Sequence, residues 1–76
     1  MGELRDKVME ELREKVRELR RKKAWTQEDL AREVEVSLST VQRWEKRGGK
    51  PTRLARRELA RLFEEAGILV GGYNGR

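Results

Sequence analysis

One short stretch, residues 37–46, places polar side chains on a flank that its own apolar residues leave free. On a helix that begins at Ser37, the apolar Val41 and Trp44 share one face, and the other flank carries Leu38, Ser39, Gln42, Arg43 and Lys46. A guanidinium can donate two hydrogen bonds to guanine O6 and N7, a glutamine amide can pair with adenine, and an aliphatic side chain can contact the thymine methyl group. These residue types suit the edges of DNA bases, and Arg43 is the strongest single candidate.

The residues just before this stretch predict a second short helix that would position it. Thr26 with Asp29 three residues later resembles a capping box, so we expect a helix over about residues 27–34, with Leu30, Ala31 and Val34 on its buried side. Ser37 is expected to cap the next helix, about residues 38–47, which the glycines at 48 and 49 would end. Because only about three residues separate the two helices, they must cross steeply, as in a helix-turn-helix.

Two longer amphipathic segments flank this pair. The first, about residues 3–23, has an apolar stripe at Leu4, Val8, Leu12, Val16 and Leu19, which either packs against the rest of the domain or forms a dimer seam. The second, about residues 52–66, follows Pro51 and has an apolar face of Leu54, Ala55, Leu59, Leu62, Phe63 and Ala66. The sequence therefore predicts an all-α, compact four-helix domain over residues 1–70. We expect Ile68 to Val70 to pack on the first helix near Leu4 and Val8, and residues 71–76 to form a flexible tail.

Composition narrows the function. The chain has 76 residues, enough for one domain, and contains neither cysteine nor histidine, so the commonest metal ligands and general bases are missing. We therefore expect no enzyme activity, no metal and no cofactor. The longest apolar run, GILVGG at residues 67–72, is far shorter than the roughly 20 residues that span a bilayer. We expect no membrane partner and a cytoplasmic location, the cytosol or nucleoid if the chain is bacterial.

Positive charge is concentrated in one part of the chain. The net charge is +5, yet residues 3–18 are close to neutral. Residues 43–57 hold one acidic residue, Glu45, and seven basic ones, Arg43, Lys46, Arg47, Lys50, Arg53, Arg56 and Arg57. Such a block suits a polyanion, although a solvated basic face is the alternative. We expect Lys46, Arg47, Lys50 and Arg53 to contact DNA phosphates.

The spaced residues of segment 26–51 resemble the phage repressor and Cro class of helix-turn-helix regulators, the XRE class. The matching positions are Thr26, Gln27, Leu30, Ala31, Val36, Ser37, Thr40, Val41, Trp44, Glu45 and Pro51. The resemblance implies that the third helix enters the major groove of double-stranded DNA. It also implies that Leu38, Ser39 and Arg43 face base edges, with Gln42 beside them, and that Ser37, Thr40 and Lys46 lie nearer phosphate.

The resemblance implies two further roles. Gln27, which opens the second helix, would bind a phosphate and brace a recognition side chain, with simple helix capping as the alternative. Arg20, late in the first helix, would form a partly buried ion pair with Glu45. One position departs from the family pattern, because Glu35 stands where the turn usually has glycine. A non-glycine residue at positive φ costs about 1 kcal/mol or more, so the turn is expected to be strained or differently shaped.

Three alternatives stay open at the level of sequence. A helix-turn-helix can serve as a protein-docking module, as in antitoxin-like or polymerase-binding proteins, and an apolar patch on the third helix would favour that use. The chain could bind DNA as a monomer or as a homodimer on a palindrome. Its richness in glutamate and arginine with short loops is typical of a thermophilic protein or of a redesigned member of the family.

Overall fold

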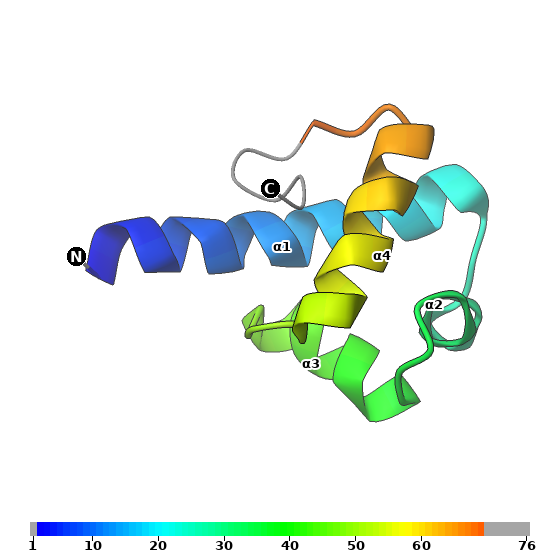
Figure 1. Cartoon of the computed structure of the whole chain (residues 1–76), viewed down its shortest axis with the longest axis horizontal. Coiled ribbons are helices and arrows are strands. Elements are labelled where there is room, and N and C mark those ends of the chain that lie inside the picture. Colours follow the sequence, from blue (N-terminus) through cyan, green and yellow to red (C-terminus); the bar gives the residue numbers. More distant parts are fainter. Residues whose placement is uncertain (1, 70–76) are drawn as a thin grey trace.

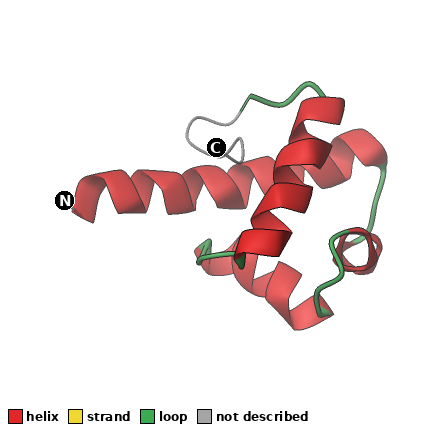
Figure 2. Ribbon diagram, in the orientation of Figure 1, coloured by secondary structure: helices red, strands yellow, loops and turns green. Residues whose placement is uncertain are grey.

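The computed structural model describes the backbone of residues 2–69 and the side chains of residues 11–69. Its four helices are α1 (Gly2–Lys23), α2 (Gln27–Glu33), α3 (Leu38–Arg47) and α4 (Arg53–Glu65). The long α1 lies along the molecule, α3 and α4 pack against it, and α2 is seen nearly end-on beside α3 (Figure 1). All regular structure in residues 2–69 is helical (Figure 2), and the prediction of an all-α four-helix domain is confirmed.

The three later helices all begin at a hydroxyl side chain. Thr26, Ser37 and Thr52 have extended backbone angles, and each side-chain oxygen accepts a hydrogen bond from the N–H three residues further on, at 3.1, 3.2 and 3.2 Å. Asp29 returns a bond of 2.9 Å to the Thr26 N–H, which completes the expected capping box. Each such cap stabilises its helix by about 1 kcal/mol. Thr52, which was expected inside the fourth helix, is therefore its cap.

The ends of α1, α2 and α4 share one hydrogen-bond pattern. In each, a residue of positive φ follows the helix: Ala24 (57°), Glu35 (56°) and Gly67 (73°). The next N–H reaches back to the carbonyl oxygen five residues earlier, from Trp25 to Arg20 (2.8 Å), from Val36 to Ala31 (2.9 Å) and from Ile68 to Phe63 (2.8 Å). This is the Schellman motif, which satisfies carbonyl groups that the helix leaves unpaired. Val34 and Ala66, expected as the last helical residues, are the caps of α2 and α4.

The motif also delivers an apolar side chain to the core after each helix. Trp25 and Val36 are partly buried against the core and Ile68 is buried within it. Trp44 of α3 is the largest fully buried side chain among the described residues, and Leu12, Val16 and Leu19 of α1 are fully buried as well. The core is completed by Leu30, Ala31, Val34, Val41, Ala55, Leu59, Leu62 and Phe63. Packing from all four helices thus fixes the position of α3.

Two expectations about apolar residues are wrong. Leu54 is 67% exposed, because it shares the outer face of α4 with Glu58 and Arg61 rather than the phase of Ala55, Leu59 and Leu62. Leu69 is 90% exposed, so of the two described residues of the expected tail contact Ile68 packs inward and Leu69 does not. The side chains of Leu4 and Val8, with Val70 and the tail 71–76, lie outside the described residues.

Candidate nucleic-acid interface

Helix α3 presents the flank that the sequence predicts. Val41 and Trp44 are buried, whereas Leu38, Ser39, Gln42, Arg43 and Lys46 are all exposed. Figure 1 shows α2 viewed along its axis while α3 runs across the view, so the two helices cross steeply. The hydrogen bonds of Glu35 and Val36 to the end of α2 hold this turn, and Glu35 has the positive φ that the motif demands. The turn therefore has the standard geometry despite its glutamate.

Three hydroxyl groups gather at the start of α3. The Ser37 oxygen, which caps the helix, lies 3.1 Å from the Ser39 hydroxyl and 2.8 Å from the Thr40 hydroxyl. No acidic residue occurs in the first turn of α3. Because the N-terminal end of a helix carries partial positive charge, this end favours an anion. The start of α3 therefore carries a small cluster of hydrogen-bond donors and acceptors, Ser37, Ser39 and Thr40. The family resemblance predicts that this end of the helix faces DNA.

Glu45 lies at the centre of a buried network behind the exposed flank. Its side chain is 6% exposed, and Arg20 donates two hydrogen bonds to its carboxylate, from Nε at 2.6 Å and from Nη2 at 2.9 Å. The Arg20 Nη1 also donates to the Trp25 carbonyl at 3.2 Å. The hydrogen bond to Glu45 raises the pKa of Arg20 above its ordinary value. The ion pair expected between Arg20 and Glu45 is present, and it ties α1 to α3 with bidentate geometry.

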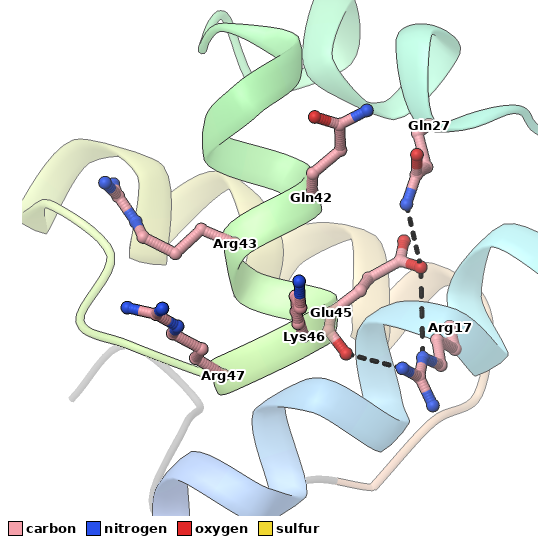
Figure 3. A pocket seen from close by; sticks show the side chains of 7 residues that line it. All are labelled: Arg17, Gln27, Gln42, Arg43, Glu45, Lys46 and Arg47. Carbon is pink, nitrogen blue, oxygen red and sulfur yellow. Dashed lines mark hydrogen bonds and ion pairs between the residues drawn. The ribbon is translucent and has the colours of Figure 1, made fainter.

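Gln27 belongs to the same network. Its Nε2 donates to Glu45 Oε1 at 3.2 Å (Figure 3). A carboxylate oxygen can only accept a hydrogen bond, so this contact requires the amide nitrogen to face Glu45 and the amide oxygen to face away. Gln27 thus braces α2 against α3, and the amide group presents an acceptor and one remaining N–H toward the groove. The phosphate contact expected of Gln27 stays a prediction.

Two arginines of α1 that sequence reasoning did not single out hold the far end of α3. Arg17 Nη2 donates to the backbone carbonyl of Glu45 at 2.6 Å, and Arg13 Nη1 donates to that of Lys46 at 3.5 Å. These carbonyl groups belong to the negative end of the α3 dipole, which cations stabilise. A signal was available, because Arg13, Arg17 and Arg20 each follow one residue of the buried stripe Leu12, Val16 and Leu19 and so share one edge of the helix.

The side chains of α1, α2 and α3 enclose a shallow groove of about 530 Å³. Its lining consists of Arg17, Gln27, Gln42, Arg43, Glu45, Lys46 and Arg47 (Figure 3). Four of these side chains are cationic, and the single acid is the one that Arg20 already pairs. The groove therefore has the charge of a receptor for anions.

Comparison with known protein families shows to which family this arrangement of helices belongs. A family model described as "Helix-turn-helix", of the XRE/Cro/C1 type, matches residues 16–65, which include the later part of α1 and all of α2, α3 and α4. The chain belongs to this helix-turn-helix family. No curated protein and no solved structure gives a significant match. Membership of the family implies DNA binding, typically in transcription regulation.

In this helix-turn-helix protein the basic surface extends beyond α3. Arg43, Lys46, Arg47, Lys50, Arg53, Arg56 and Arg57 are all exposed, and none of them forms an ion pair within the described residues. Arg53, Arg56 and Arg57 lie in the first turns of α4, where the helix dipole disfavours cations. We refer to these seven residues as the basic surface. The described residues therefore supply no acidic partner for its charge.

The family match covers a DNA-binding domain, and it identifies no catalytic domain. No helix among the described residues is long and apolar enough to cross a membrane. The described side chains also contain no group of three residues suited to hold a metal ion.

Proposed function

We propose that the protein binds specific sites in double-stranded DNA by placing α3 in the major groove, and acts as a transcription regulator or as a designed DNA binder. The observation that carries this proposal is the exposed flank of α3, whose polar residues stand beside the uncompensated basic surface. Arg43 projects from α3 away from Arg17, Gln27 and Glu45 (Figure 3). A bidentate arginine contact to guanine discriminates against other bases by about 1–3 kcal/mol.

The remaining contacts divide by chemistry. Ser39 and Gln42 offer hydrogen-bonding groups to base edges, and Leu38, which is 37% exposed, offers an aliphatic surface to a thymine methyl group. Phosphates are assigned to the hydroxyl, amide and basic groups around them: Gln27, Ser37, Thr40, Lys46, Arg47, Lys50 and Arg53. Phosphate contacts position the helix and supply most of the affinity, whereas base contacts supply the specificity.

A protein-docking role is the competing function. Docking modules bury an apolar patch, and the exposed flank of α3 has one large apolar residue, Leu38, among polar and cationic neighbours. Lysine is depleted in protein interfaces whereas arginine is enriched there, so within the basic surface Lys46 and Lys50 are the residues that argue against docking. These observations favour DNA over a protein partner.

Titration of binding to random duplex DNA with salt tests the class of partner. If about five phosphates are contacted, a plot of log affinity against log salt concentration has a slope of about −4 or steeper. A flat response would exclude DNA as the partner.

Selection of bound duplexes from a random library tests the base-reading residues. Arg43→Ala is expected to relax the preference at one guanine position by about 1–3 kcal/mol while leaving the other positions unchanged. The symmetry of the selected motif also reports whether one copy or two bind. An unchanged motif in the Arg43→Ala variant would show that Arg43 reads no base.

A further inference from the structure

Arg17 braces α3, but this contact uses only part of its guanidinium group. Its Nη2 donates to the Glu45 carbonyl at 2.6 Å, yet 58% of its side chain remains exposed. The guanidinium has five N–H groups in a rigid fork, and a single carbonyl contact leaves most of them available. One edge of the group is therefore anchored and the other faces solvent at the mouth of the groove.

The charges around Arg17 favour an anion there. The side chains of Arg43, Lys46 and Arg47 line the same groove. The single acid of the lining, Glu45, is 6% exposed and receives both nitrogens of the Arg20 fork together with Gln27 Nε2. Arg17 Nε lies 3.9 Å from Glu45 Oε1, too far for a hydrogen bond. The carboxylate is thus neutralised behind the groove, whereas Arg43, Lys46 and Arg47 at its mouth have no acidic partner among the described residues.

The position of Arg17 also relates it to the reading helix. Figure 3 shows Arg17 approaching from α1 on the side of Glu45 and Lys46, with Gln27 and Gln42 on the opposite side of the groove. When α3 lies in the major groove of a duplex, one phosphate backbone runs along each side of that helix. Arg17 stands beside the C-terminal half of α3, where one of these backbones would run.

We propose that Arg17 binds a DNA phosphate, so that α1 contributes a direct contact to the interface as well as bracing α3. This inference rests on the proposed DNA-binding function. The carbonyl contact fixes the guanidinium before binding, which reduces the entropy lost when the phosphate is engaged. Arg17 therefore couples the position of α3 to the position of the DNA backbone through a single side chain.

The salt dependence of Arg17→Gln tests the proposal. Removal of one phosphate contact is expected to reduce the slope of log affinity against log salt concentration by about 0.9, and to weaken binding about fivefold at 0.15 M salt for specific and random duplexes alike. Arg17→Lys retains the charge and should keep the slope. Circular dichroism and thermal unfolding of each variant establish that it folds.

Arg61→Gln is the matched control, because it removes the same charge from a residue that pairs with Glu58 and Glu65 on α4 and does not line the groove. Its slope should fall by less than half as much. If Arg17→Gln leaves the slope of the wild-type chain unchanged, Arg17 only braces α3 and the inference is wrong, although the DNA-binding function stands. If the wild-type slope is itself flat, the proposed function fails first.

Discussion

Charged residues in two regions of the molecule behave in opposite ways. In the network of Arg20, Gln27 and Glu45, every charge meets a partner at hydrogen-bond distance, and the carboxylate is buried. On the basic surface, seven cations are exposed and none has an acidic partner in the described residues. Glu45, the single acid in segment 43–57, points inward to the network. Charge therefore fixes geometry in the first region, whereas in the second it lacks compensation, as the proposed contact with DNA phosphates requires.

Helix α4 repeats this contrast along its own length. Its first turns carry Arg53, Arg56 and Arg57, whereas Arg61 further on donates to Glu58 and Glu65 at 2.8 and 2.9 Å. These contacts, with Glu58 first, raise the pKa of Arg61 above its ordinary value. The half of α4 nearest α3 is thus the half that lacks compensation, which agrees with a binding surface that continues from α3.

Glu45→Gln should have the largest effect, and it acts on folding. The variant leaves Arg20, whose side chain is 25% exposed, without a carboxylate, and loss of one partner of a largely buried pair destabilises by about 2–4 kcal/mol. Denaturant unfolding measures this loss. Glu58→Gln removes an exposed acid from the pair with Arg61 and should change stability by less than about 1 kcal/mol. Equal losses in the two variants would remove the distinction between the two regions.

The double change Lys50→Gln with Arg53→Gln should affect binding and leave folding almost unaltered. Two fewer phosphate contacts reduce the salt slope by about 1.8 and weaken binding by roughly 25-fold at 0.15 M salt. Stability should stay within about 0.5 kcal/mol, because surface substitutions without partners have little effect. Binding titrations and thermal unfolding report the two quantities. The control is Lys15→Gln with Arg61→Gln, which removes two cations that are paired with acids.

The smallest expected effect concerns Asp29, an acid whose charge is stabilised by hydrogen bonds from the cap of its own helix. The hydrogen bond from the Thr26 N–H, followed by that from the Thr26 side chain, lowers the pKa of Asp29 below its ordinary value of 3.8. The unfolded chain then binds the proton more readily, so the stabilisation is complete above the unfolded pKa and is lost as the pH falls through the folded one. Melting temperatures of the wild-type chain and of Asp29→Asn, measured between about pH 2 and pH 7, should differ most at neutral pH and converge in acid. A constant difference at every pH would assign the effect to shape alone.

The sequence predicts the fold through patterns that are local. Hydroxyl caps at Thr26 and Ser37 and the apolar phase of Leu12, Val16 and Leu19 depend on neighbours a few residues away, so they can be read directly. Leu54 was assigned to the wrong face because it lies next to the buried Ala55 at the start of α4. A shift of one residue changes the face of a helix, and the first turn alone is too short to show which of the two residues is buried.

The site was harder to predict where contacts join distant segments. The pair of Arg20 and Glu45 was expected because of the family resemblance, since 25 residues separate the two positions. Arg17 was missed because its partner is a backbone carbonyl, which every residue has, so the one signal was its place after Val16 on the same edge of α1 as Arg20. The orientation of the Gln27 amide likewise follows from a carboxylate that only the folded chain brings near.

The three Schellman motifs have a consequence for the unfolded chain. They need a residue at positive φ, and this chain uses glycine at position 67 but alanine at 24 and glutamate at 35. A residue with a Cβ atom is strained there, yet it also has fewer conformations to lose on folding than glycine has, and the second effect offsets part of the first. The helix-turn-helix thus depends on a backbone conformation and not on one amino acid. Position 35 can therefore carry a side chain, which a strict requirement for glycine would have kept out of the turn.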